Sequence, residues 1–320
     1  MSAFEVLTMG RVGVDLYPLQ AGVGLDQVET FGKWLGGSAT NVAVAAARYR
    51  RRAAVITRTG DDPFGAFIHS ALKGYGVDDR YVTAVEELPT PVTFCEVFPP
   101  DDFPLYFYRQ PKAPDLEIFS EELDFDAIRE ADVFWVTGTG LSQEPSRSAT
   151  LAALEARGGR GITVLDLDYR PMFWPSREEA RYWVRRALPQ VSVAVGNLDE
   201  ADMAVARREP LAAARALHEL GVGLAVVKQG PRGVLASDWS DVVEVPPVPV
   251  DVVNGLGAGD AFGGALCHGL LAGWDTGQVM RFANAAGAIV ASRLACSDAM
   301  PTAEEVTSLL ECGTREDTSA

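Results

Sequence analysis

The sequence has few of the residues that build metal centres or disulfide frameworks. Only four cysteines and three histidines occur among 320 residues, and no two cysteines form a C-x-x-C pair. The cysteines are Cys95, Cys267, Cys296 and Cys312. Such wide separation is typical of reduced, mostly buried thiols in a cytosolic protein. None of the three histidines has a neighbour that suggests a triad or a zinc site, so we assign them no role.

Positive charge is scarce as well. The chain has 28 Lys and Arg against 44 Asp and Glu, which gives a net charge of −16. Neither nucleic acid nor an anionic membrane is therefore an expected partner, and an anionic ligand must be bound by a local cluster of donors. The sequence has no apolar run of the roughly 18 residues that a membrane span needs, and its start lacks the basic segment of a signal peptide. We expect a cytoplasmic protein.

Short apolar runs alternate with helical patterns along a chain of ordinary globular composition, with 48% hydrophobic and 22% charged residues. Buried strands are predicted at residues 5–9, 54–57, 133–137, 162–167, 191–195 and 224–227. Helices are predicted over 178–188 and 210–220, and from the Asp62-Pro63 cap to Gly74 or Gly76. The alternation predicts an α/β fold with a doubly wound, mostly parallel sheet and helices on both faces. Ligands in such folds bind beyond the carboxyl ends of the strands.

Two stretches interrupt this alternation. Residues 11–35 are Gly-rich and begin as an alternating strand, and residues 90–109 form a hairpin pattern around a Pro-Pro-Asp-Asp turn. Together they predict a small β-sheet lid over a cleft; a plain edge meander is the alternative. We therefore expect a core of residues 1–10, 36–89 and 115–312, a lid of residues 11–35 and 90–114, and a flexible tail of residues 313–320. An exposed edge of the lid could pair two copies into a homodimer.

The strongest local motif is Asn-Gly-Leu-Gly-Ala-Gly-Asp at residues 254–260, followed by a small-residue helix pattern over 263–271. Alternate glycines let backbone N–H groups converge at the start of a helix, which forms an anion cradle. Asp260 has the wrong charge for a phosphate neighbour unless it takes a proton from an attacking hydroxyl. The alternative is that Asp260 merely caps the helix. Neither a P-loop nor a dinucleotide fingerprint is present.

A second glycine pair, Gly36-Gly37, precedes Asn41 and an alanine-rich helix pattern at residues 42–47. The glycines allow a ligand close to the backbone, and Asn41 can both donate to and accept from a sugar hydroxyl. Alternatively, this is an ordinary loop in which Ser38 caps a tightly packed helix.

Polar residues also follow two of the predicted strands. Asp166, Asp168 and Arg170 lie at one strand end, where carboxylates can bind hydroxyls and an arginine can bind a carboxylate or phosphate; a surface ion pair is the alternative. Asn197 and Glu200 lie at the next, where they could order Mg²⁺ waters and phosphate oxygens or form a helix capping box. The residues alone favour the cap.

In this order, the motifs resemble those of the ribokinase-like (PfkB) family of sugar kinases over nearly the whole chain. Gly36-Gly37-x-x-x-Asn41 is similar to the family's sugar-binding signature. The stretch from Gly257 to Asp260 is similar to its second signature, which implies an anion hole formed by Gly257, Ala258 and Gly259 and a catalytic base at Asp260.

The resemblance also implies ATP and Mg²⁺ as cofactors, with a monovalent cation as a further candidate. It places Asn197 and Glu200 near phosphate and Mg²⁺, the latter through water, in place of the cap interpretation. The residues that it assigns to the nucleotide are Asn197, Lys228, Gly230, Gly233, Gly257, Gly259 and Asn284.

At the residues expected to bind the sugar, the chain resembles one branch of the family in particular. Residues 10–18, 107–114 and 168–174 are similar to the branch that phosphorylates 5-dehydro-2-deoxygluconate in inositol catabolism. That implies sugar hydroxyls at Asp15, Gly36, Gly37, Asn41 and Asp168, and a sugar carboxylate at Arg109 and Arg170. Many members carry Asp where this chain has Asn254, which argues against a charged role there; the inositol branch also tends to carry Asn. The alternatives are a 2-keto-3-deoxygluconate kinase, a fructokinase-like member, or an idle sensor of sugar or nucleotide.

Overall fold

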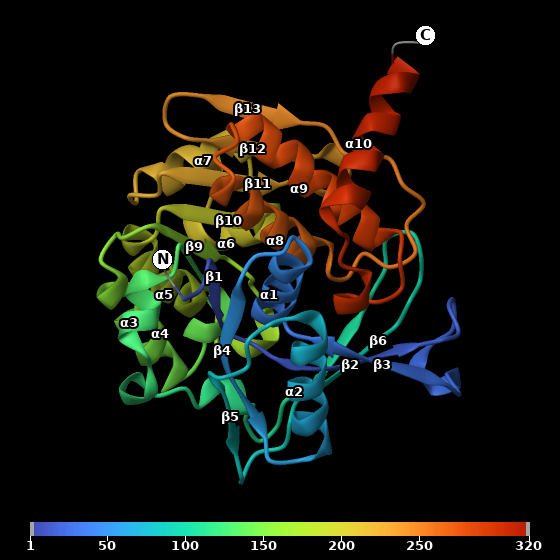
Figure 1. Cartoon of the computed structure of the whole chain (residues 1–320), viewed down its shortest axis with the longest axis vertical. Coiled ribbons are helices and arrows are strands. Elements are labelled where there is room, and N and C mark those ends of the chain that lie inside the picture. Colours follow the sequence, from blue (N-terminus) through green and yellow to red (C-terminus); the bar gives the residue numbers. More distant parts are fainter. Residues whose placement is uncertain (1–2, 318–320) are drawn as a thin grey trace.

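A nine-stranded sheet forms the centre of the molecule (Figure 1). The computed structural model describes residues 3–317, with side chains through residue 312. The strand order is β13-β12-β11-β10-β9-β8-β1-β4-β5, and every neighbouring pair from β11 to β5 is parallel. The strands are β1 (Val6–Met9), β4 (Ala53–Gly60), β5 (Val82–Val85), β8 (Val133–Thr137), β9 (Ile162–Asp166), β10 (Val193–Asn197), β11 (Leu224–Lys228), β12 (Val234–Ser237) and β13 (Val242–Val245).

Helices cover both faces of this sheet, as predicted (Figure 1). One face packs against α1 (Ser38–Arg48), α2 (Pro63–Tyr75), α8 (Ala258–Leu271), α9 (Thr276–Ala291) and α10 (Ala303–Asp317). The other packs against α3 (Phe125–Glu130), α4 (Ser146–Arg157), α5 (Arg177–Ala187), α6 (Leu198–Val205) and α7 (Pro210–His218). Side chains alternate between the two cores, since Val6 of β1 joins one and Leu7 the other.

Local signals in the sequence account for several helix ends. Asp62 caps α2 by accepting from the backbone N–H groups of Phe64 and Gly65, and Gly76 ends the helix with a left-handed φ of 79°. The cap that Ser38 offered is not used: Gly37 is the N-cap of α1, and the Ser38 hydroxyl donates to Asp168 instead. Helix α8 starts at Ala258, five residues before the predicted pattern, so Asp260 lies in its first turn.

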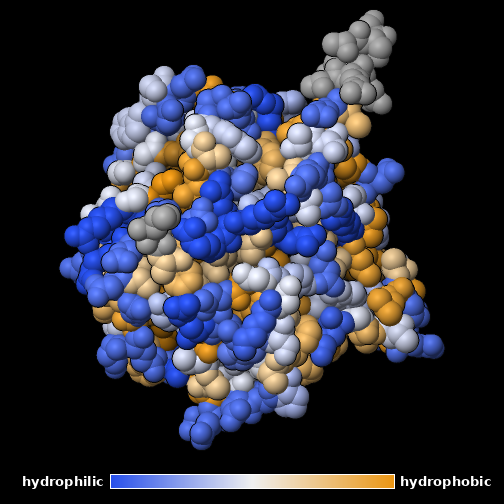
Figure 2. Space-filling view, viewed as in Figure 1, coloured by the Kyte–Doolittle hydropathy of each residue, from blue (hydrophilic) through white to orange (hydrophobic). Residues whose placement is uncertain are grey.

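The two interrupting stretches form a separate four-stranded sheet, which extends from the core at the lower right of Figure 1. Its order is β3-β2-β6-β7, from β2 (Gly13–Pro18), β3 (Phe31–Gly36), β6 (Val92–Cys95) and β7 (Leu105–Tyr108). The predicted hairpin is confirmed, with Val92 opposite Tyr108. Its exposed large apolar side chains are Leu19, Phe31, Tyr106 and Tyr108, and Figure 2 shows hydrophobic residues gathered near this sheet.

Other predictions concern the cysteines, the membrane and the tail. Cys95, Cys267 and Cys296 are buried and Cys312 is exposed, and all four are free thiols. No helix within residues 3–317 is both long and apolar enough to cross a membrane. Helix α10 extends to Asp317 and so includes part of the predicted tail, whose last three residues lie outside the described residues.

Candidate active site

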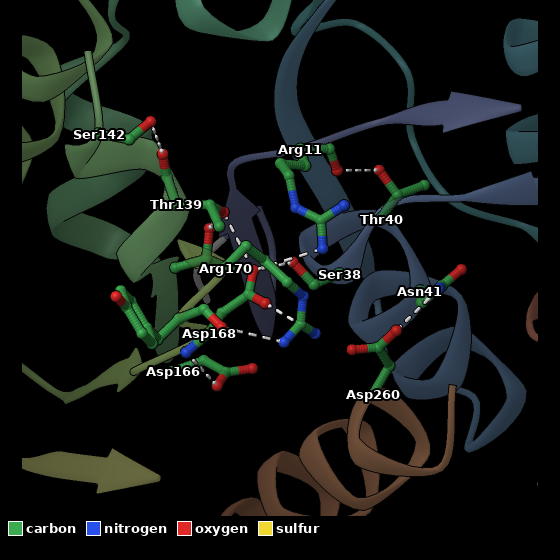
Figure 3. A network of polar contacts seen from close by, with 12 residues as sticks. Arg11, Ser38, Thr40, Asn41, Thr139, Ser142, Asp166, Asp168, Arg170 and Asp260 are labelled. Carbon is green, nitrogen blue, oxygen red and sulfur yellow. Dashed lines mark hydrogen bonds and ion pairs between the residues drawn. The ribbon is translucent and has the colours of Figure 1, made fainter. Parts of the chain in front are cut away.

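The candidate site lies at the carboxyl ends of β1, β8 and β9, where the strand order reverses direction (Figure 3). Strands β1 and β8 are hydrogen-bonded neighbours although more than a hundred residues separate them in the chain. The chain leaves β1 toward β4 on one side and later returns to β8 on the other. Such a reversal opens a crevice between the loops that follow the two strands, and ligands of doubly wound folds bind there.

Asp260 and Asn41 lie side by side in this site, joined by a hydrogen bond (Figure 3). Asn41 Nδ2 donates to Asp260 Oδ2 at 2.7 Å, and Asn41 Oδ1 accepts from the Ser297 hydroxyl at 2.8 Å. Burial raises the pKa of Asp260 to about 6, although the hydrogen bond from Asn41 acts in the opposite direction. A carboxylate of this basicity is suited to accept a proton near neutral pH.

A glycine turn leads directly into the first turn of α8, and its role as an anion cradle stays a prediction. Gly257 is the N-cap of α8 at φ 80°, and a Cβ there would lie 2.7 Å from Cys296 Sγ. A Cβ at Gly259 would lie 3.1 Å from Lys228 Nζ, so the ammonium group approaches the positive end of α8. Asn254 is buried and holds the preceding loop, because it donates to Leu294 O and accepts from Leu256 N.

Asp166, which is buried at the end of β9, and Lys228, which is half-buried at the end of β11, influence each other's pKa. Burial raises the pKa of Asp166 to about 8, and the charge of Lys228 opposes that rise. Burial would lower the pKa of Lys228, but Asp166, Glu200 and Asp260 outweigh it and raise the pKa above its ordinary value. Lys228 therefore stays charged beside the glycine turn, where it can attract phosphate oxygens.

Asp168 is the centre of a polar network (Figure 3). It accepts from the Ser38 hydroxyl at 2.7 Å and the Thr139 hydroxyl at 3.0 Å, and it pairs with Arg170 at 3.1 Å and Arg11 at 3.5 Å. Burial alone would raise the pKa of Asp168, but the two arginines and the two hydroxyls bring it below its ordinary value. The alternative of a surface ion pair is wrong, because the Asp168 side chain is only 2% exposed.

The two arginines expected to bind a sugar carboxylate are already paired with protein carboxylates. Arg109 Nη2 lies 2.5 Å from Asp115 Oδ1, and both side chains are buried. Arg170 contacts Glu200 Oε1 at 3.6 Å in addition to Asp168. Both arginines therefore already have acceptors within the protein, and the guanidinium carbon of Arg109 also lies 5.1 Å from the centre of the Phe173 ring.

Asn197 and Glu200 form the capping box that the residues alone favour. Asn197 Oδ1 accepts from Glu200 N at 2.9 Å, and Glu200 Oε2 accepts from Asn197 N at 2.7 Å. Glu200 Oε1 faces Arg170. Within the described residues, no three His, Cys, Asp or Glu side chains are placed to hold a metal together. The donor set fits Mg²⁺ only as a water-bridged contact from Glu200 to an ion that arrives with phosphates.

Asp15 lies under the turn that carries Gly36 and Gly37. It accepts from the Tyr17 hydroxyl at 2.7 Å, and burial raises its pKa to about 6. A Cβ at Gly36 would lie 2.3 Å from the Asp15 carboxyl carbon, so only glycine lets the turn approach this carboxylate.

The residues expected to contact the nucleotide base lie around β11 to β13 and α9. Gly230 and Gly233 have φ values of 58° and 91° in the turn after β11. A Cβ at Gly233 would lie 2.0 Å from Val245 O, so packing alone requires glycine at this position. Asn284 Nδ2 donates to Pro246 O at 2.7 Å. Their nucleotide contacts stay predictions.

Three polar residues of the site had no role predicted from the sequence: Arg11, which lies within the similar stretch 10–18, Thr139 and Ser297. Arg11 follows β1 and Thr139 follows β8, so their positions just after central strands could have indicated them. Ser297 has no such signal. Its hydroxyl contacts Asn41 Oδ1 and Leu35 O, and each of these two contacts spans more than 250 residues.

Comparison with known proteins identifies the family of the chain. The model of the pfkB family carbohydrate kinases matches residues 3–303. The 5-dehydro-2-deoxygluconokinase of Geobacillus kaustophilus is 33% identical over 314 residues, covering 96% of this chain and 93% of the relative. The enzyme of that name from Bacillus subtilis is 31% identical, covering 97% and 96%.

Solved structures give the same fold. A fructokinase from Xylella fastidiosa with bound ATP has a TM-score of 0.85 at 24% identity, covering 97% of this chain and 99% of that one. A fructokinase double mutant from Vibrio cholerae with fructose, ADP and potassium has a TM-score of 0.86 at 24% identity, with the same coverage. The fold is ribokinase-like, with a mostly parallel sheet and a smaller second sheet.

Proposed function

Since the chain belongs to the pfkB family of carbohydrate kinases and is a phosphotransferase that acts on a sugar hydroxyl, we propose that its substrate is an acidic keto-deoxy sugar. The reaction that we propose transfers the γ-phosphoryl group of ATP to the primary hydroxyl of 5-dehydro-2-deoxygluconate, giving the 6-phosphate. The observation that carries this proposal is the pair of guanidinium groups on Asp168, across the crevice from the Asp260 carboxylate (Figure 3). The names of the relatives support the choice of acid.

Asp260 is the general base in this proposal. Its carboxylate accepts the proton of the primary hydroxyl as that oxygen attacks phosphorus, and Asn41 keeps the carboxylate oriented. The backbone N–H groups of Gly257, Ala258 and Gly259 stabilise the charge on the transferring oxygens, aided by the start of α8. Lys228 adds a positive charge beside the same turn.

Sugar and nucleotide bind through separate groups. Asp15, Gly36, Gly37, Asn41 and Asp168 hold sugar hydroxyls, and Arg170 holds the acid end. Mg²⁺, when bound with ATP, supplies charge neutralisation between the phosphates, and Glu200 with Asn197 would contact its water shell. The four-stranded sheet acts as a lid that excludes water from the crevice, which limits ATP hydrolysis without sugar.

The direct test is the identity of the product. The chain is incubated with Mg-ATP and 5-dehydro-2-deoxygluconate, and the product is examined by phosphorus NMR. We expect one phosphomonoester whose phosphorus couples to the two protons of the C6 methylene group. Release of inorganic phosphate without a sugar phosphate, or phosphorylation at a secondary hydroxyl, would contradict the proposal.

The pH dependence of kcat follows from the raised pKa of Asp260. A protonated carboxyl cannot accept a proton, so activity requires the ionised form, which is lost as pH falls through about 6. We expect kcat to be level above pH 7 and to fall about tenfold per pH unit well below 6. The measurement is the steady-state rate with saturating substrates from pH 5 to 8. A rate that stays constant down to pH 5 would exclude Asp260 as the titrating base.

A further inference from the structure

We propose that Arg11, to which no motif assigned a role, binds the substrate carboxylate together with Arg170 and makes the site selective for acidic sugars. This inference rests on the proposed function, because it requires an acidic substrate. Arg11 is the second residue after β1, at the point where the strand order reverses. Its side chain therefore enters the crevice from the middle of the sheet (Figure 3).

The guanidinium group of Arg11 has unused donors. Its side chain is only 10% exposed, yet within the described residues its one hydrogen bond is from Nη2 to Asp168 Oδ2, at 3.5 Å. Its Nε is buried and has no partner. A guanidinium group carries five N–H donors, and leaving them unpaired away from water is costly. A ligand carboxylate would supply the missing acceptors.

The neighbouring arginines, Arg109 and Arg170, have closer carboxylate acceptors than Arg11 has. Arg109 lies 2.5 Å from Asp115, whose other oxygen accepts from the backbone N–H of Val12 at 3.1 Å. Arg170 has both Asp168 and Glu200. Arg11 shares Asp168 with Arg170 at the longer distance. Of the three, Arg11 therefore has the most capacity to bind an added anion, with Arg170, whose Nε is also unpartnered, beside it.

Aromatic rings hold Arg11 in this position. Its guanidinium carbon lies 5.8 Å from the centre of the Phe107 ring and 5.9 Å from that of Phe173. Phe107 comes from the lid strand β7 and Phe173 from the loop after β9, and the two rings pack edge to face. The rings shield the cation from water, which strengthens a charge-assisted hydrogen bond. Lid and core therefore meet at Arg11.

The backbone of Arg11 is also fixed against the turn that precedes α1. Its carbonyl oxygen accepts from the Thr40 hydroxyl at 3.0 Å, and a Cβ at Gly37 would lie 2.4 Å from the same oxygen. Burial raises the pKa values of Asp15 and Asp260, and the charge of Arg11 opposes that rise in both. Arg11 therefore faces the space that the proposed function assigns to the sugar.

The test compares an acidic sugar with its neutral counterpart. The substrates are 5-dehydro-2-deoxygluconate and the analogue in which the carboxylate is reduced to a hydroxymethyl group. Arg11→Gln should raise KM for the acid about 10- to 100-fold, the range for losing a charge-assisted pair, and change KM for the neutral sugar less than about 3-fold. Arg11→Lys keeps the charge without the planar fork and should lie between wild type and Arg11→Gln.

A matched control is Arg58→Gln. Arg58 is a largely buried arginine with an unpartnered Nε, and it contacts Glu117 O and Glu122. We expect its KM ratio between the two sugars to equal that of the wild type. If thermal melting shows that Arg11→Gln does not fold, the test uses Arg11→Lys instead, with the same ratio of KM for the acid to KM for the neutral sugar.

The outcomes separate the inference from the proposed function. A wild-type enzyme that prefers the neutral sugar overturns both. Suppose that the wild-type enzyme prefers the acid. The inference alone is then overturned if Arg11→Gln keeps this preference, or if its KM rises equally for both sugars. A loss confined to the acid supports it.

Discussion

Replacing Asp260 with asparagine is expected to lower kcat about 10²- to 10⁴-fold, the contribution of a general base in proton transfer. The amide is nearly isosteric with the carboxylate but cannot accept the hydroxyl proton. The cradle formed by Gly257, Ala258 and Gly259 is unchanged, so the affinity for Mg-ATP should stay within about threefold of the wild type. ADP release measures kcat, and isothermal titration calorimetry measures nucleotide binding.

The matched control for this prediction is Asp199→Asn. Asp199 also lies in the first turn of a helix, α6, but its exposed side chain pairs with Arg208 on the surface. Its loss should leave kcat unchanged, since surface ion pairs contribute little. An Asp260→Asn enzyme that retains more than about a tenth of wild-type kcat would exclude the assigned role. Loss of kcat and nucleotide binding together would mean that Asp260 supports structure.

Replacing Gly257 with alanine is expected to lower kcat about 10²- to 10³-fold, as removal of an oxyanion-stabilising donor does. The added Cβ would lie 2.7 Å from Cys296 Sγ and 2.9 Å from its Cβ, so the turn must move. Its φ of 80° is also unfavourable for alanine. Displacing this turn misdirects the backbone N–H groups that we assign to the transferring phosphoryl group.

The matched control is Gly76→Ala, which introduces similar backbone strain away from the candidate site. Gly76 has nearly the same φ, 79°, at the end of α2, but a Cβ there meets no atom within 4 Å. Backbone strain should cost each variant about 1 kcal/mol of stability, and Gly257→Ala should lose more because its Cβ meets Cys296; denaturant unfolding measures both. Only Gly257→Ala should lose turnover. Equal kcat values for the two variants would exclude the glycine turn as the anion hole.

Much of the fold could be predicted from the sequence because its signals are local. Short β-branched runs predicted the central strands, and the Asp62-Pro63 pair predicted the start of α2. The end of α2 was predicted at Gly74 or Gly76, and the helix ends at Gly76. The hairpin from β6 to β7 followed from alternation around a turn. The start of α8 was missed because residues 255–259 are rich in glycine, which has a low helix propensity. Tertiary packing against α1 and α9 overrides that propensity.

The connections within the site were harder to predict. Asp260 and the glycine pair could be named from their motifs, but the partners of Asp168 come from three other segments and depend on strand order. Asp168 also has a positive φ of 27°, which a strand pattern does not predict. Arg109 and Asp115 are only six residues apart, but no regular helix or strand joins them, so their spacing does not predict the pairing. No local pattern reveals that this arginine already has an acceptor.

The central claim is that this carbohydrate kinase acts on an acidic keto-deoxy sugar. It is tested most directly by ADP release with Mg-ATP across 5-dehydro-2-deoxygluconate, 2-keto-3-deoxygluconate, fructose, ribose and adenosine. We predict the highest kcat/KM for 5-dehydro-2-deoxygluconate, with the neutral substrates at least about tenfold lower. That difference corresponds to the one charge-assisted contact that a neutral sugar cannot make. A higher kcat/KM for fructose or ribose would contradict the account, because Arg11 and Arg170 would then have no carboxylate to bind.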